Sequence, residues 1–140
     1  MTNHQKIPVF VYGTLKRGCS NHYLMGKTAD PIMTSATGLL MYQLPGYPMA
    51  MPGNGVIHGE LYWVDQESVR RLDRLEGHPK FFCRELWKLD HPDISAWIYL
   101  CPDGTGYPII ESGNWVESRT RYNEIIARQV ISGDPQNGTV

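Results

Sequence analysis

The distribution of proline and glycine sets the strongest limit on how this chain folds. Ten prolines and 14 glycines are spread over 140 residues. Because proline removes a backbone donor and both residues interrupt regular structure, they leave room only for short helices and strands. The chain contains no internal repeat and no low-complexity tract. These features predict a single domain built from short elements.

The segments between these breaks predict five strands. Strands are expected where β-branched and aromatic residues alternate or run together, at 9–12, 32–42, 56–64, 81–90 and 94–100. The last two flank a turn-like His-Pro-Asp and predict a hairpin. Residues 43–55, in which Pro and Gly recur, predict a loop, and Gly59 predicts a bulge or a close approach of another backbone.

The helical patterns and the short strands together predict an α+β fold. A well-bounded helix is expected at 65–77, and weaker patterns lie at 20–26 and 111–130, whereas residues 132–140 are expected to fray. Because closing a short sheet removes exposed edges, we expect a small mixed β-barrel with flanking helices. The domain is expected to cover residues 1–140, with its core over about 7–130.

The composition argues against several classes of protein. Fourteen acidic residues nearly cancel 13 basic ones, for a formal charge of -1, so the chain lacks the basic character of a nucleic-acid binder. No apolar run approaches the roughly 20 residues of a membrane span, and the first residues lack the apolar core of a secretion signal. We therefore expect a cytoplasmic protein that binds neither nucleic acid nor membrane.

Cysteine and histidine do not indicate a metal site. The three cysteines are widely spaced without a CxxC pair, and the five histidines have no metal-ligand spacing. Reduced thiols and the absence of a bound metal are the expected state.

The helix expected at 65–77 carries an acidic side chain on its apolar face. Asp65 suits its N-cap and Gly77 its left-handed end. Helical spacing places Leu72, Asp73 and Glu76 on the same face of this helix as Val69. Burial would raise the pKa of Glu76 from about 4.3 toward neutrality, which suits a general acid/base. Alternatively, Glu76 reaches solvent past the helix end or pairs with Arg84 or Arg119.

A glycine-containing loop, YGTLKRG at residues 12–18, follows the first strand. In one interpretation it is only a tight strand-to-helix connection. In the other, the backbone N–H groups of Gly13, Thr14 and Leu15 form a concavity that holds a carboxylate without a charged side chain. A phosphate-binding P-loop does not fit, because its essential lysine is absent after Gly18.

Three ordered motifs resemble one known family. The stretches VFVYGTLKRGCSNHYL, GVIHGELYWV and LDRLEGHPKFFCRE occur in the order and at the intervals typical of the γ-glutamylcyclotransferase-like family, particularly its short bacterial and γ-glutamylamine cyclotransferase branches. The resemblance spans about residues 9–100, with weaker echoes in GNW and RYNE. It implies a small β-barrel with flanking helices.

The resemblance also implies roles for particular residues. The loop of Tyr12, Gly13, Thr14 and Leu15 corresponds to the segment that binds the γ-glutamyl group through its amides, and Glu76 corresponds to the residue that transfers protons. In the implied reaction the α-amino group of a γ-glutamyl amide attacks its own γ-carbonyl. The products are 5-oxoproline and a free amine or amino acid, and neither a metal nor an organic cofactor is required.

Three positions leave alternatives open. Phe82 stands where many relatives carry Tyr, so either a hydrogen bond to the substrate is lost or an apolar wall is formed. Arg84 is expected to brace the fold rather than to orient Glu76, and Asn21 to cap a helix rather than to bind substrate. Specificity for the leaving amine is expected to lie in 43–55 and in the C-terminal segment.

A second hypothesis is that this protein catalyses no reaction. In it the chain is a non-catalytic relative that binds a γ-glutamyl or acidic metabolite, or a protein partner. Retention of Glu76 favours the enzyme.

Overall fold

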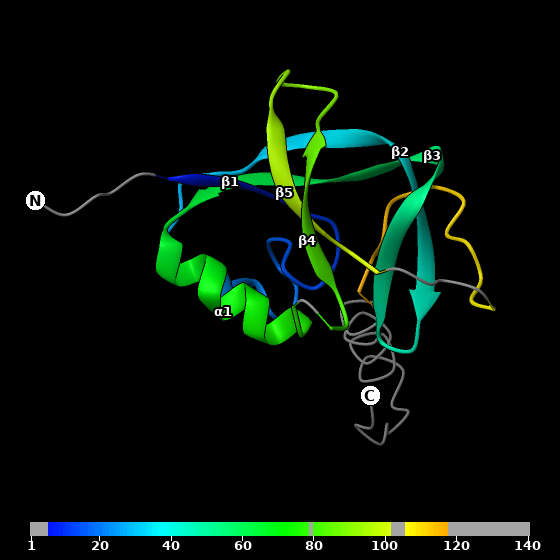
Figure 1. Cartoon of the computed structure of the whole chain (residues 1–140), viewed down its shortest axis with the longest axis horizontal. Helices are drawn as coiled ribbons and strands as arrows, with labels where there is room; N and C mark the ends of the chain where they lie inside the picture. Colours follow the sequence, from blue (N-terminus) through cyan, green and yellow to red (C-terminus); the bar gives the residue numbers. More distant parts are fainter. Residues whose placement is uncertain (1–5, 79, 102–105, 118–140) are drawn as a thin grey trace, which may run out of the picture.

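Five strands and one α-helix make up the described part of the chain, which comprises residues 6–78, 80–101 and 106–117 of a computed structural model (Figure 1). The elements in chain order are β1 Ile7–Val11, the 3-10 helix η1 His22–Met25, β2 Ile32–Leu44, β3 Tyr47–Val64, α1 Gln66–Glu76, β4 Cys83–Lys88 and β5 Ser95–Leu100. The expected strands and the expected helix after β3 are therefore present, with β3 much longer than predicted.

The strands form one mixed, curled sheet in the order β2-β3-β1-β5-β4. β1 runs parallel to β5, and the other neighbouring pairs are antiparallel. The segment after β4 reaches across to β2, because the Asp90 N–H donates to the Ser35 carbonyl at 3.0 Å. The Asp90 carboxylate also accepts hydrogen bonds from the hydroxyls of Ser35 and Thr37, at 2.7 and 2.9 Å. The sheet is thus a half-barrel, which confirms the expected mixed, barrel-like fold.

Both faces of β1 are buried, which explains its uninterrupted apolar sequence. Successive side chains of a strand point to opposite faces, so alternate residues of β1 enter two different cores. One core lies between the sheet and α1 and contains, among others, Val9, Val11, Tyr62, Val69 and Leu72. The other fills the inside of the curl and contains, among others, Phe10, Leu39, Ile57, Leu61 and Ile98.

The boundaries of α1 agree with the sequence prediction. The Asp65 carboxylate accepts a hydrogen bond from the Ser68 N–H at 2.8 Å, which satisfies one of the unpaired donors at the helix start. Gly77 ends the helix with φ 69°, in the left-handed region that glycine adopts readily. The helix therefore stops directly after Glu76, which sets the position of that side chain.

The prediction of a loop at 43–55 is wrong. β2 and β3 instead form a long hairpin whose ladder begins at the pair Leu44 and Tyr47. The orientation of Ala50 shows why prolines are tolerated in β3. Its N–H donates to the Tyr12 hydroxyl and its carbonyl accepts from the Cys101 N–H, so neither group pairs with β2. Pro48 and Pro52, two residues to either side, have the same orientation and need no N–H toward β2.

The remaining local predictions have mixed outcomes. The pattern at 20–26 forms only the 3-10 turn η1. Gly59 does mark a close approach, since a Cβ there would lie 2.3 Å from the Val11 carbonyl oxygen. The helical pattern at 111–130 is not helical up to residue 117, and its remainder lies outside the described residues, as does 132–140. No helix in the described ranges has both the length and the apolar character needed to cross a membrane.

Candidate active site

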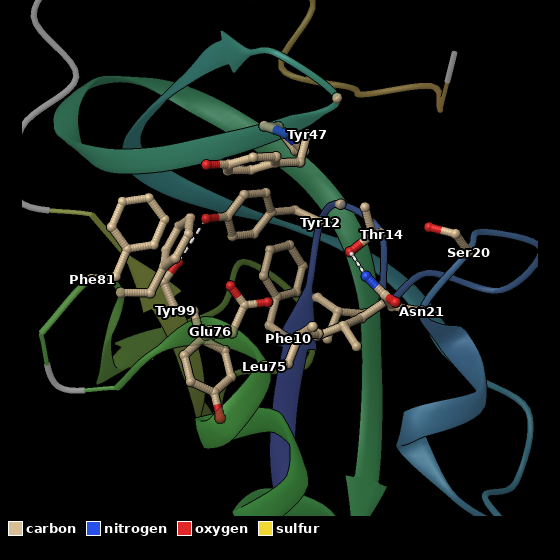
Figure 2. Close-up of a pocket in the computed structure, with 16 residues that line it drawn as sticks. Phe10, Tyr12, Thr14, Ser20, Asn21, Tyr47, Leu75, Glu76, Phe81 and Tyr99 are labelled. Carbon is tan, nitrogen blue, oxygen red and sulfur yellow. Dashed lines mark hydrogen bonds between the residues drawn. The ribbon is translucent and has the colours of Figure 1, made fainter. Parts of the chain in front are cut away.

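One cavity lies where the end of β1, the β2–β3 turn and the end of α1 meet (Figure 2). Its volume is about 400 Å³. All the site residues predicted from the sequence line it, namely Tyr12, Gly13, Thr14, Leu15 and Glu76. The fold therefore brings together two segments that are about 60 residues apart in the sequence.

Glu76 directs its carboxyl group into this cavity (Figure 2). Burial raises its pKa to about 7, from an ordinary value of 4.5. Within the described residues the carboxyl group has no hydrogen-bond or ion-pair partner that would hold it in the charged form. A carboxyl group with this pKa accepts and returns a proton near neutral pH.

Arg84 does not pair with Glu76. Its guanidinium binds the neighbouring Asp73 through two hydrogen bonds, of 2.7 and 3.1 Å, and the Tyr99 hydroxyl donates to the same carboxylate at 2.6 Å. Burial raises the pKa of Asp73, but the hydrogen bonds from Arg84 and Tyr99 outweigh that effect and hold the pKa below its usual range. Arg84 thus braces α1 against the sheet, as expected, whereas Arg119 lies outside the described residues.

The amides at the start of the loop have no acceptor in the part of the chain that the structure describes. Within the described part of the chain, the N–H groups of Gly13, Thr14 and Leu15 make no hydrogen bond, whereas the Gly13 and Thr14 carbonyls accept from Lys16 and Asn21. Backbone donors that are neither exposed nor paired are uncommon in folded proteins. Because all three residues line the cavity, these amides are available to an anionic group inside it.

Two buried carboxylates hold the rest of the loop. Glu60 of β3 is only 7% exposed, and its Oε1 accepts hydrogen bonds from the Arg17 N–H and from the Tyr62 hydroxyl, both at 2.8 Å. Glu117, equally buried, accepts from the Ser20 N–H at 3.0 Å. Sequence reasoning missed both residues. A signal for Glu60 was present, because it is a carboxylate within a strand that is apolar on both faces.

Tyr12 and Asn21 make contacts within the protein. The buried Tyr12 hydroxyl donates to the Tyr99 carbonyl at 2.7 Å and accepts from the Ala50 N–H at 3.0 Å, so the ring lines the cavity while the hydroxyl is occupied. Asn21 is the N-cap residue of the 3-10 helix η1, as predicted, but its side chain makes no capping hydrogen bond. Its Nδ2 instead donates to the Thr14 hydroxyl at 3.0 Å (Figure 2), which tightens the loop beside the unpaired amides.

Aromatic and aliphatic side chains form the other side of the cavity. Tyr47 comes from the start of β3, Leu75 from α1, and Phe81 and Phe82 from the segment after α1. Phe82 is buried and packs against both Phe81 and Tyr47, so it forms part of an apolar wall. The expectation that residues within 43–55 contribute to the pocket agrees with the position of Tyr47, although it lies in a strand rather than in a loop.

Acidic, histidine and cysteine side chains do not gather into a cation site in the described ranges. No group of three such side chains there is arranged to hold a metal ion.

Comparisons with known proteins agree with this picture. The model of the family described as gamma-glutamyl cyclotransferase, AIG2-like, matches residues 9–117. A gamma-glutamylcyclotransferase family protein of Citrobacter rodentium is 36% identical over 110 residues, which cover 78% of this chain and 95% of that protein.

Solved structures of similar proteins have the same fold. The ytfP protein of Escherichia coli is 34% identical with a TM-score of 0.59, and the alignment covers 81% of this chain and 99% of that one. An AIG2-like protein from Mus musculus is 25% identical with a TM-score of 0.66, over 81% of this chain and 90% of that one. From its sequence match and its half-barrel fold, the chain belongs to the gamma-glutamyl cyclotransferase, AIG2-like family.

Proposed function

We propose that this protein is a γ-glutamyl cyclotransferase that converts a γ-glutamyl amide into 5-oxoproline and a free amine. The observation that carries the proposal is the arrangement of one cavity, which is lined by a carboxyl group with a pKa of about 7 and by three residues whose backbone amides have no acceptor among the described residues. Family membership supports the same reaction class.

In this proposal the amides of Gly13, Thr14 and Leu15 bind the α-carboxylate of the substrate. Backbone N–H groups in such a concavity bind an anion without a charged side chain. The glutamyl chain then extends toward Glu76, with its α-amino group and γ-carbonyl close together. Holding the chain in this conformation favours ring closure over reaction with water.

Glu76 moves the proton in both halves of the reaction. Its carboxylate takes a proton from the α-ammonium group, and the resulting amine attacks the γ-carbonyl carbon. The bond between that carbon and the leaving nitrogen breaks as Glu76 returns the proton to the nitrogen. A second proton leaves the ring nitrogen as it becomes an amide, and the released amine takes up a proton from solvent. General acid/base catalysis of this kind contributes about 10²–10⁴-fold in rate.

The test is the release of 5-oxoproline from γ-glutamyl amides by the purified protein. Glu76→Gln keeps the shape of the side chain but cannot carry the proton, so the rate is expected to fall by about 10²-fold or more while binding persists. Glu67→Gln, an exposed carboxylate in the first turn of the same helix, is the matched control and is expected to retain full activity.

The binding-only hypothesis predicts a different result. A protein that binds γ-glutamyl amides without releasing 5-oxoproline from any of them would overturn the proposed reaction. Full turnover by the Glu76→Gln variant would overturn the proposed role of this residue. As a substrate control, an amide with an acetylated α-amino group has no nucleophile and is expected to remain intact.

A further inference from the structure

One carbonyl group of the loop after β1 is bonded to a side chain. The Leu15 carbonyl oxygen lies 2.9 Å from Nδ1 of His22, the first residue of η1. The carbonyls of Gly13 and Thr14, by contrast, accept hydrogen bonds from backbone N–H groups. Because a carbonyl oxygen only accepts, Nδ1 of His22 must carry a hydrogen and donate it to Leu15.

This bond restrains the direction of the unpaired amides. In a trans peptide the C=O and N–H groups point in opposite directions. The peptide between Leu15 and Lys16 is held at both ends, since its carbonyl accepts from His22 and its N–H donates to the Gly13 carbonyl at 3.0 Å. The second of these bonds fixes the peptide between Gly13 and Thr14. The Thr14 N–H, which has no acceptor among the described residues, is therefore directed away from the turn.

The ring of His22 is itself held in place. It packs against the ring of Tyr62 in β3, with centroids 5.5 Å apart. Tyr62 is buried and donates its hydroxyl hydrogen to Glu60 at 2.8 Å, and the His22 N–H donates to the Cys19 carbonyl at 3.2 Å. The imidazole is therefore fixed between β3 and the loop rather than free to turn in solvent.

His22 acts on the cavity only through the loop. It is not one of the residues that line the cavity, so its imidazole does not contact a molecule bound there. We propose that His22 is a positioning residue, whose Nδ1–H bond to the Leu15 carbonyl orients the loop amides for the carboxylate that they bind. The inference rests on the proposed cyclotransferase function and adds to it a residue outside the cavity.

Two substitutions separate the hydrogen bond from the packing of the ring. His22→Asn removes the ring but places an amide N–H close to the position of Nδ1. His22→Phe keeps a ring against Tyr62 but has no donor. His22→Gln, whose amide reaches toward the position of Nε2 instead, is a second variant without a donor at Nδ1 and is expected to behave like His22→Phe.

The kinetic test uses γ-glutamyl-methylamide and γ-glutamyl-alanine as substrates. For His22→Phe and His22→Gln, the KM for release of 5-oxoproline is expected to rise about 3- to 10-fold, which corresponds to the loss of one hydrogen bond. The value of kcat is expected to stay nearly unchanged, because the loop holds the glutamyl group equally before and during reaction. His22→Asn is expected to restore KM to within about twofold of the wild type.

A role in packing alone predicts the opposite order. In that case His22→Phe would keep the wild-type KM and His22→Asn would raise it, and this result would overturn the inference. An equal KM in all the variants and the wild type would overturn it as well. Tyr23→Ala, at the exposed next position of η1, is the matched control and is expected to leave both constants unchanged.

Hydrogen exchange of the Lys16 amide, measured by NMR, tests the inference without a substrate. Exchange is expected to be at least about threefold faster in His22→Phe than in the wild type, and close to the wild-type rate in His22→Asn. Nitrogen NMR of the neutral His22 ring is expected to find the proton on Nδ1. A proton on Nε2, or the same exchange rate in all three proteins, would overturn the inference.

These measurements also keep the inference separate from the proposed function. If the wild type releases no 5-oxoproline from either amide while His22→Phe alone speeds exchange of the Lys16 amide, the function fails and the role of His22 in orienting the loop stands. If the wild type turns over both amides and the His22 variants match it in KM and exchange, the function stands and the role of His22 fails.

Discussion

Glu76 combines an unfavourable position for folding with a favourable one for chemistry. Its carboxyl group lies in a cavity without a cation among the described residues, and burial raises its pKa to about 7. The nearby Asp73, one turn earlier in the same helix, binds Arg84 and Tyr99 and has a lowered pKa. Two carboxylates on one helix face therefore differ in pKa, because Asp73 has hydrogen-bond donors and Glu76 has none among the described residues.

The raised pKa predicts that replacing Glu76 stabilises the protein at alkaline pH. The folded pKa lies above the ordinary value of 4.5, so ionised Glu76 lowers the free energy of unfolding as pH rises from about 4.5 to about 7, and the loss is complete above that range. Glu76→Gln is therefore expected to be more stable than the wild type at pH 8, by up to about 3 kcal/mol. Urea unfolding at pH 8 and pH 5 measures the difference.

The sign of the change in the free energy of unfolding, and its dependence on pH, distinguish removal of the buried charge from a change in packing. The stability gap between variant and wild type is expected to shrink at pH 5. A stability difference of the same size at pH 5 and pH 8, or a variant less stable than the wild type at pH 8, would contradict the prediction. Glu67→Gln on the exposed face of α1 is expected to change the free energy of unfolding by less than about 0.5 kcal/mol at either pH.

The same pKa predicts an acidic limb in the rate profile. Below pH 7 the Glu76 carboxyl group is increasingly protonated and no longer takes a proton from the substrate. The value of kcat/KM is expected to fall about tenfold per pH unit below this midpoint. The α-carboxyl and α-amino groups of the substrate titrate outside the range from pH 5 to 7. A flat profile over that range would rule out Glu76 as the base.

At the scale of elements, the loop after β1 is shaped by carboxylates from distant parts of the chain. Glu60 of β3 binds the Arg17 N–H, and Glu117 binds the Ser20 N–H. These acceptors satisfy later amides of the loop, whereas the earlier amides of Gly13, Thr14 and Leu15 have no acceptor among the described residues. Under the proposed function, both carboxylates are positioning residues that hold the substrate-binding loop without contacting the substrate.

Weakening one of these acceptors is predicted to affect substrate binding more than turnover. Glu60→Gln replaces a charged acceptor with a neutral one, and hydrogen bonds to charged groups are the stronger. The KM for γ-glutamyl amides is expected to rise about 3- to 10-fold with kcat nearly unchanged, because the loop holds the glutamyl group equally before and during reaction. Steady-state kinetics measure the two constants separately.

A purely structural role for Glu60 would give a different outcome. In that case thermal stability would fall while KM stayed at the wild-type value. Glu85→Gln, at an exposed position of β4, is the control for removal of a carboxylate from the sheet and is expected to change neither constant.

At the scale of the whole molecule, one backbone hydrogen bond and several side-chain hydrogen bonds, rather than a strand ladder, draw the two edges of the sheet together. Asp90 binds Ser35 and Thr37 of β2, and the Trp87 indole N–H donates to the Thr37 carbonyl at 2.9 Å. These contacts curl the sheet around its inner core. The β2–β3 turn lies near the start of β4 (Figure 1). At the cavity, the ring of Tyr47 packs against the ring of Phe82.

Removing the Asp90 carboxylate is predicted to weaken this closure. Asp90→Ala is expected to lower the free energy of unfolding by about 1 kcal/mol, since the hydrogen bonds from two hydroxyls to a charged group are lost at an exposed site. Denaturant titration measures it. Asp93→Ala, which removes an exposed ion pair with Lys88, is expected to change stability by less than about 1 kcal/mol. Equal effects of the two variants would contradict a special role for Asp90.

Much of the candidate site was predictable because its signals are local. The caps Asp65 and Gly77 mark both ends of α1, and helical spacing from Val69 places Glu76 on the buried face. The first strand and the glycine loop after it are likewise predicted from neighbouring residues. Such local patterns do not show which side chains pair with each other in three dimensions. Arg84 was a possible partner of Glu76 by sequence, but in three dimensions it binds Asp73.

The hairpin of β2 and β3 and the bracing of the loop depend on contacts between distant segments. Prolines at 48 and 52 predicted a loop because local rules penalise them, and only the pairing with β2 shows that their missing N–H groups face away from the ladder. Glu60 is 43 residues from Arg17, and Glu117 is 97 residues from Ser20. Periodicity and capping report on residues within one or two turns, so the sequence alone was enough for the helix, the first strand and the face of Glu76. The cavity arises from long-range packing, which determines the neighbours of that carboxyl group and therefore its pKa.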